Sequence, residues 1–121
     1  MRPRDFKGRC TKKKLKKCQD VARLYDQIQI AFASLLDADK TVKSFMCNVL
    51  LEDSEIGNYT TDFVCTKNDG EYFVRECVWR SKLVLPRTAK MLEVSRQYWR
   101  HRGITDWGII TEKENSENET L

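Results

Sequence analysis

The most constraining feature of the sequence is a hairpin signal, Asn68-Asp69-Gly70, between two runs of strand-forming residues. The run before it spans residues 59–65 and the run after it spans residues 71–79, and both are rich in aromatic and β-branched side chains. Glycine in such a turn supplies the left-handed backbone position that a tight hairpin needs. The sequence therefore predicts two antiparallel strands joined by a short loop.

The length of this loop decides which side chains face each other, because a shift of one residue turns every strand side chain to the opposite face. A three-residue loop at 68–70 pairs Asp62 with Glu76, whereas a two-residue Asp69-Gly70 loop places Cys77 opposite Asp62. We expect the three-residue loop, with its glycine in the left-handed conformation. Paired Cβ atoms are about 5 Å apart. The two carboxylates would then be close enough to hold one Mg²⁺ or Mn²⁺ ion.

Asp62 also interrupts a run of strand-forming residues, in which aspartate is disfavoured. A buried carboxylate without a partner is costly, so a buried Asp62 has to find a cation, an arginine or a proton. Two alternatives to a metal site remain open at this point. Either the two acids lie on a solvated face of the sheet, or they pair with Arg75 and Arg80.

Helix and strand patterns extend on both sides of the hairpin. Residues 21–36 carry apolar side chains at helical spacing, which predicts an amphipathic helix. Residues 41–51 predict a strand before the hairpin. A second helix is expected to begin at Pro86 and to end before Gly103, and residues 105–111 predict a last strand. The expected order is helix, three antiparallel strands, helix and strand, in one α/β domain.

Charge is distributed unevenly, although the net charge is only +4. Residues 1–23 hold ten Lys or Arg and two Asp, and residues 85–103 hold five Lys or Arg and one Glu, whereas 24–84 and 104–121 are acidic. Two basic segments around an acidic middle fit a phosphate-binding rim beside a cation-binding centre, although a solvated tail and a solvated helix face are the alternative. The residues that we expect to bind DNA are Lys12, Lys13, Lys14, Lys16, Lys17, Lys90, Arg96 and Arg100.

We expect a flexible basic arm over residues 1–18, one folded domain over residues 19–112 and a disordered acidic tail over residues 113–121. Apolar runs are too short for a membrane span or a signal peptide, so we expect a cytoplasmic protein. The five cysteines are widely spaced, with His101 as the one histidine. That pattern disfavours disulfides and a zinc site, and predicts free thiols that fill the core.

Several motifs resemble segments of one protein family. They are Thr61-Asp62-Phe63-Val64, Pro86-Arg87-Thr88, Leu92 to Trp99, Arg102-Gly103-Ile104 and Trp107 to Glu112. Together they resemble the N-terminal nuclease domain of the TnsA family, the endonuclease subunits of heteromeric cut-and-paste transposases. The resemblance covers roughly residues 25–112. It implies a restriction-endonuclease-like PD-(D/E)xK fold, with a mixed central sheet flanked by helices, and Mg²⁺-dependent cutting of one DNA strand at the ends of the element. It also implies a transposase partner subunit for the other strand and an ATPase partner, which full-length members contact through a C-terminal helical domain that we do not expect here.

The resemblance assigns Asp62 to the metal-binding aspartate of the second strand and Glu76 to the acidic position of the third. The catalytic lysine of the family falls at Val78, and its helix glutamate falls at Gln29, on the border of the apolar stripe. Valine cannot orient water or stabilise a phosphate, and glutamine is a weaker, neutral ligand. Arg80, two residues past Val78 on the same expected strand face, is the expected replacement for the missing positive charge.

Two functions follow from this resemblance and its departures. The first is a metal-dependent endonuclease with an atypical site of Asp62, Glu76, Gln29 and Arg80. The second is a catalytically degenerate nuclease-fold subunit that binds DNA or assembles a transposase or another mobile-element complex.

Overall fold

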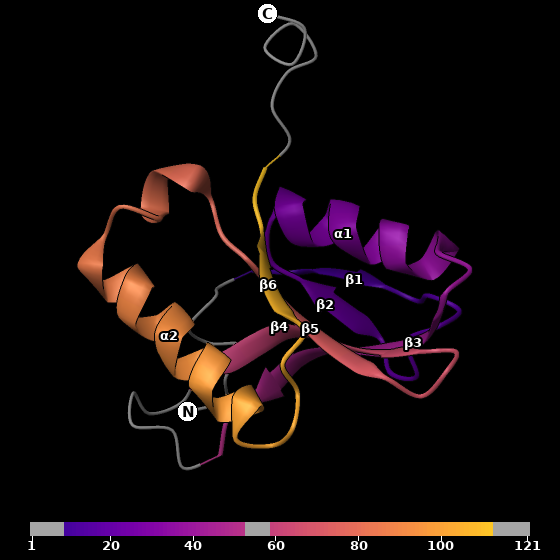
Figure 1. Ribbon diagram of the computed structural model, residues 1–121. Coiled ribbons are helices and arrows are strands. Elements are labelled where there is room, and N and C mark those ends of the chain that lie inside the picture. The colour runs from indigo at the N-terminus through magenta and orange to yellow at the C-terminus, as the bar shows by residue number, and fades with distance from the viewer. Residues whose placement is uncertain (1–8, 53–58, 113–121) are drawn as a thin grey trace, which may run out of the picture.

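The computed structural model describes residues 9–52 and 59–112 and contains a four-stranded sheet with a long helix on either side (Figure 1). The strands in spatial order are β3 (Val42–Leu50), β4 (Thr60–Lys67), β5 (Tyr72–Cys77) and β6 (Trp107–Ile110). The first three pair antiparallel, and β6 lies parallel to β5. The helices are α1 (Gln27–Ala38) and α2 (Pro86–Arg100). The predicted order of elements and the mixed α/β sheet are confirmed.

A two-stranded hairpin precedes α1, formed by β1 (Thr11–Lys13) and β2 (Ala22–Leu24). Cys18, between these strands, is buried and forms a β-bridge with Phe45 of β3. The structure therefore differs from the expected flexible arm, because residues 11–18 include a strand and a core side chain. Residues 1–8 and the predicted tail at 113–121 lie outside the described residues.

α1 begins at Gln27 and not at residue 21, where the apolar spacing predicted its start. Asp26 is the N-cap, and its carboxylate accepts a hydrogen bond from the Gln29 N–H at 2.9 Å. The residues before the cap are drawn into β2 by pairing with β1. The first and last residues of β2 are buried. The prediction had assigned these apolar side chains to a helix, but a strand presents them to the core. None of the helices in the described residues is long and apolar enough to cross a bilayer.

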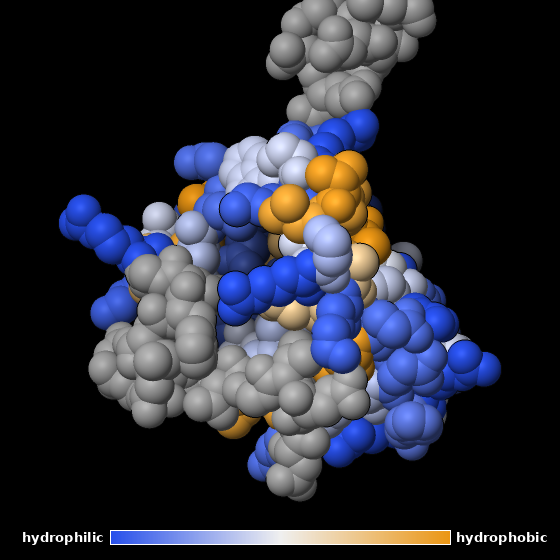
Figure 2. Space-filling view, turned by 90° about the vertical axis from the view of Figure 1, so that its left-hand side faces the viewer, coloured by the Kyte–Doolittle hydropathy of each residue, from blue (hydrophilic) through white to orange (hydrophobic). Residues whose placement is uncertain are grey.

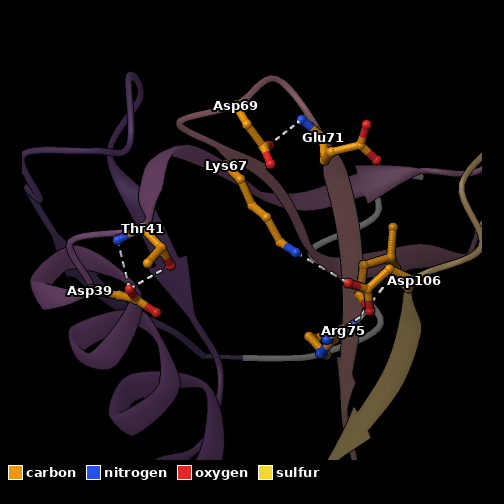
Figure 3. A network of polar contacts seen from close by, with 8 residues as sticks. Asp39, Thr41, Lys67, Asp69, Glu71, Arg75 and Asp106 are labelled. Atoms are coloured by element: carbon orange, nitrogen blue, oxygen red, sulfur yellow. Dashed lines mark hydrogen bonds and ion pairs between the residues drawn. The ribbon is translucent and has the colours of Figure 1, made fainter.

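The β4–β5 hairpin has the three-residue loop that was predicted. Gly70 has a φ of +90°, in the left-handed region that glycine adopts without strain. The Asp69 carboxylate accepts a hydrogen bond from the Glu71 N–H at 2.9 Å and stiffens the turn (Figure 3). Phe63 pairs with Arg75 in the ladder, which centres the loop on Asp69.

Each face of the sheet has its own core. The core on the α1 side is the larger, and it includes Leu24, Ala33, Leu36, Phe45, Phe63, Cys65 and Phe73. The core on the α2 side consists of Leu51, Val64, Val74 and Trp99. Neighbouring residues of a strand point to opposite faces, which is why Phe63 and Val64 of β4 belong to different cores.

Charged side chains tie the start of β6 to the hairpin strands. Asp106 forms a salt bridge with Arg75 at 2.9 Å and lies 3.8 Å from the Lys67 ammonium group (Figure 3). The Arg75 guanidinium also lies 4.9 Å from the centre of the Phe73 ring. Gly108 of β6 leaves room for this arrangement, because a Cβ there would stand 3.4 Å from the Arg75 side chain. The parallel strand is therefore held by side chains as well as by its ladder.

Candidate functional site

The register of the β4–β5 hairpin brings Asp62 and Glu76 together. The ladder between β4 and β5 ends at the pair Phe63 and Arg75, directly next to positions 62 and 76. The backbone N–H of Asp62 donates a hydrogen bond to Glu76 Oε1 at 3.0 Å, which shows the two residues in direct contact. The predicted adjacency of these acids is confirmed. A one-residue slip would have placed Cys77 there instead.

The Asp62 carboxylate is buried and is held by two protein donors. The side chain is 6 % exposed. Its Oδ1 accepts a hydrogen bond from Gln29 Nε2 at 2.8 Å, and its Oδ2 accepts one from the Cys77 N–H at 2.7 Å. The predicted alternative of a solvated face is wrong, because Asp62 is enclosed. Arg75 forms its salt bridge with Asp106, whereas pairing of the acids with Arg80 stays a prediction.

Gln29 reaches Asp62 from the first turn of α1 and is 4 % exposed. The orientation of its amide follows from a second contact, in which the Tyr25 N–H donates to Gln29 Oε1 at 2.7 Å. Since that oxygen is an acceptor, the NH₂ group is the part that faces Asp62. The structure thus brings the predicted residue to the site, but as a hydrogen-bond donor to the carboxylate.

The Glu76 carboxylate is fully buried and is enclosed from the α2 side. The Ser95 hydroxyl donates to Glu76 Oε2 at 2.6 Å, and the Trp107 indole N–H in turn donates to Ser95 Oγ at 3.0 Å. Tyr59 is also hydrogen-bonded to Glu76. Burial, together with the negative charges of Glu76 and Asp62, raises the pKa of Tyr59, so this phenol stays neutral.

Sequence reasoning missed three residues of this cluster, namely Ser95, Trp107 and Tyr59. One signal was present for Ser95, because a serine among the apolar residues on the inner face of α2 needs a buried partner. The roles of Tyr59 and Trp107 depend on how β4, β6 and α2 pack together. No local pattern in the sequence points to those contacts.

The donor set of this cluster does not fit Mg²⁺ as it is arranged. That ion takes about six oxygen ligands in near-octahedral geometry, several of them water. Here each of the four oxygens of Asp62 and Glu76 already accepts a hydrogen bond from the protein. Within residues 9–52 and 59–112, no group of three His, Cys, Asp or Glu side chains is placed to hold a metal ion. A cation bound here would share these oxygens with their protein donors or displace Gln29 or Ser95.

The expected position of Arg80 on the strand face of Glu76 is wrong. β5 ends at Cys77, and Arg80 opens a short 3₁₀ helix, η2 (Arg80–Lys82), so the alternation of the strand does not extend to it. Its side chain is exposed, and its backbone N–H donates to Glu112 Oε1 at 2.8 Å. Val78 stays beside the strand end, where its N–H donates to the Ile110 carbonyl at 2.9 Å.

The predicted DNA-binding residues fall on two separate elements. Lys12 and Lys13 lie on β1 and are exposed, as are Lys14 and Lys16 after it, and Lys90 and Arg100 are exposed on α2. The Lys17 side chain donates to the Asp39 carbonyl, and Arg96 forms a salt bridge with Glu93 at 3.1 Å.

The comparison with known families agrees with this architecture. The sequence matches the family described as "TnsA-like endonuclease N terminal" over residues 18–112, which is most of the chain. No curated protein shows significant similarity to it. The matched range starts at the buried Cys18 and ends just after β6, so it contains α1, α2 and the whole four-stranded sheet.

Proposed function

Because the chain belongs to the TnsA-like endonuclease N-terminal family, we propose that it is a DNA-binding subunit of a transposase complex that keeps the nuclease fold without cutting DNA. In this proposal the Asp62–Glu76 pair holds β4, β5, α1 and α2 together. The exposed cations of β1 and α2 contact the phosphate backbone. A transposase subunit and an ATPase subunit are the partners that such a complex requires.

The observation that carries the proposal is the closure of the carboxylate pair by protein donors. Gln29 and Ser95 each donate to one carboxylate, at 2.8 Å and 2.6 Å. A hydrogen bond to a charged group contributes about 1.5–3 kcal/mol to stability. If a metal took the place of both donors, the loss of these contacts would cost about 3–6 kcal/mol before the ion is bound. The cluster is better suited to maintaining the fold than to exchanging ligands.

Val78 also supports a subunit that does not cut DNA, because its side chain cannot take part in the chemistry. In the family this position carries the lysine that orients the attacking water and stabilises the charge on the phosphate. An aliphatic side chain supplies neither a proton nor a charge. Arg80 lies beyond the end of β5, and a guanidinium stays protonated, so it does not act as a general base.

The distribution of exposed cations supports binding to DNA. Basic side chains on β1 and α2 are the kind of contact that neutralises phosphates and releases counterions. Binding of this type weakens steeply as salt rises and does not require a divalent metal. We therefore expect binding to persist with a chelator, and Mg²⁺ to weaken it only as a competing counterion.

A second candidate function is Mg²⁺-dependent cutting of one DNA strand at the ends of a mobile element. The observation in its favour is the adjacency of Asp62 and Glu76 in the hairpin register, which is the relation that the family uses to hold a metal. On this alternative, the metal is bound only after Gln29 rotates away from Asp62.

Calorimetric titration with Mn²⁺ separates the two candidates without requiring a partner subunit. The wild-type chain and the Asp62→Asn variant, which keeps the shape of the side chain, are titrated side by side. We expect no saturable binding to either protein. Nicking of supercoiled DNA is then assayed with Mg²⁺ and with Mn²⁺, and we expect none above the background.

A variant with Gln29→Glu and Val78→Lys is the matched positive control, because it restores both family residues. Saturable Mn²⁺ binding to this variant, and not to the wild type, would support the proposal. Metal binding or nicking by the wild type that disappears in Asp62→Asn would overturn it in favour of the endonuclease.

A further inference from the structure

A short apolar projection lies between β5 and α2. Leu83, Val84 and Leu85 are consecutive and are 37 %, 82 % and 44 % exposed, and Trp79 before them is 36 % exposed. Single exposed apolar side chains are ordinary on a protein surface. Three in succession form a continuous patch, which indicates a contact that the isolated chain does not make.

The backbone of this projection is held in place by its own hydrogen bonds. The Lys82 N–H donates to the Trp79 carbonyl at 2.9 Å, and the Leu85 N–H donates to the Lys82 carbonyl at 3.1 Å. Pro86 then begins α2 with a fixed φ. Since the turn is ordered before any partner binds, little conformational entropy is lost when the patch is covered.

The charged side chains within the projection and the first turns of α2 are cationic, and one acidic side chain, Glu112, lies against them by accepting the Arg80 N–H at 2.8 Å. Residues 77–92 contain no Asp or Glu, and their four cations are exposed; they are Arg80, Lys82, Arg87 and Lys90. Figure 2 views the α2 side of the molecule and shows apolar surface bordered by hydrophilic side chains. A partner that matches this surface is a polyanion with a small apolar site.

The size of the patch selects among the possible polyanions. A stable protein interface buries about 800 Å² on each partner, which three aliphatic side chains do not supply. Proteins that deform DNA insert one or a few such side chains between neighbouring base pairs, while cations hold the phosphates on either side. Duplex DNA therefore matches both the charge and the size of the projection.

We infer that Val84, flanked by Leu83 and Leu85, is a wedge that enters a base step of duplex DNA while the neighbouring cations hold its phosphates. The inference rests on the proposed DNA-binding function and adds to it a local distortion of the duplex. Because the projection follows β5, the wedge lies beyond the end of the strand that carries Glu76. Pyrimidine–purine steps such as TA unstack most easily and are the expected sites.

The test measures DNA affinity and base unstacking separately, on the full chain. Fluorescence anisotropy with a labelled duplex containing TA steps gives the affinity, and permanganate oxidation of thymines reports unstacked bases in the same complex. The wild type is expected to raise thymine reactivity. The double variant Val84→Ser/Leu85→Ser is expected to lose that reactivity and to bind about tenfold more weakly, with an unchanged salt dependence.

Leu35→Ser is the matched control, because Leu35 is an apolar residue of α1 that is 66 % exposed. It is expected to change neither readout. Thermal melting checks that the double variant is folded, and the single Val84→Ser variant repeats the measurement without altering the residue that precedes α2.

The outcomes distinguish the wedge from the proposed function. DNA binding without thymine reactivity, or with equal reactivity in the double variant, overturns the wedge and leaves the DNA-binding proposal standing. Failure to bind DNA at low salt overturns both. Binding to phosphatidylserine vesicles in place of DNA, lost in the double variant, would assign the projection to an anionic membrane.

Discussion

At the scale of single residues, Gln29 determines the character of the buried carboxylate pair. The Tyr25 N–H occupies its amide oxygen, so the NH₂ group faces Asp62. A glutamate at this position would present an oxygen to Asp62, and the two carboxylates would need a shared proton or a metal ion. The amide therefore gives the buried Asp62 carboxyl group a hydrogen-bond donor without either one.

Changing Gln29→Glu should lower the free energy of unfolding by about 2–4 kcal/mol at neutral pH, because two buried carboxylates then face each other. Asp62 raises the pKa of the new carboxyl, so the loss should be small near pH 5 and grow as pH rises. Urea denaturation at both pH values measures this. Gln27→Glu is the control, an exposed position in the same turn of α1. Equal stability of the two variants at neutral pH would contradict the donor role of Gln29.

Cys65 makes a second prediction at this scale. All five cysteines are free, as predicted, and Cys65 is fully buried in the core on the α1 side. Burial raises the pKa of the Cys65 thiol from 9.0 to about 12. A folded-state pKa above the unfolded value means that the stabilisation is complete below pH 9.0 and is lost as pH rises towards 12. The free energy of unfolding should therefore be lower at pH 10.5 than at pH 8. The difference between the two pH values should be smaller in the Cys65→Val variant. An unchanged slope in that variant would assign the pH dependence to other groups.

At the scale of elements, the start of α1 positions the site. Asp26 caps the helix by accepting a hydrogen bond from the Gln29 N–H. The side chain of the same Gln29 donates a hydrogen bond to Asp62. Opposite it, the β4–β5 hairpin sets the register of the two acids through Gly70 and its three-residue loop. The site is therefore assembled from a helix N-terminus and a turn, both of which have strong local preferences.

Replacing the cap, Asp26→Ala, should destabilise the protein by about 1 kcal/mol, because the first turn of α1 loses its side-chain acceptor. Asp26→Ser, which retains a capping oxygen, should recover most of this loss. Denaturant titration followed by circular dichroism provides the measurement. If the two variants were equally stable, the cap would not be what fixes the start of α1.

At the scale of the whole molecule, the basic elements β1 and α2 and the apolar projection at residues 83–85 all lie on the surface of one nuclease fold. The fold places β1 and α2 outside the central sheet and encloses the acidic pair between the layers. The carboxylates of Asp62 and Glu76 are thereby enclosed by hydrogen bonds, while exposed cations stay at the surface. Such an arrangement is the basis of the proposed DNA binding.

The cations of α2 should not contribute equally to DNA binding. Arg100→Gln should reduce the slope of log affinity against log salt by about one, as expected for one lost phosphate contact. Arg96→Gln should reduce it less, because Arg96 already pairs with Glu93 at 3.1 Å, and hydrogen bonds from Gln97 and Arg96 lower the pKa of Glu93. Lys43→Gln, an exposed position on β3, controls for net charge. Equal slopes for all three variants would show that binding responds only to total charge.

Short-range chemistry determined much of this protein from sequence alone. The Asn68-Asp69-Gly70 turn and strand alternation predicted the hairpin and the contact between Asp62 and Glu76. Pro86 marked the start of α2. These predictions succeeded because each depends on backbone preferences within a few residues, which act in the same way in any fold.

Only the tertiary structure decided where α1 begins and which groups surround the acidic pair. Apolar spacing could not distinguish β2 from a helical turn, because pairing with β1 across the intervening residues settled the choice. The partners of Asp62 and Glu76 come from α1, β5 and α2, and they meet only when both layers pack on the sheet. A carboxylate is a metal ligand or a structural acceptor according to the donors that surround it, and those donors are set by packing.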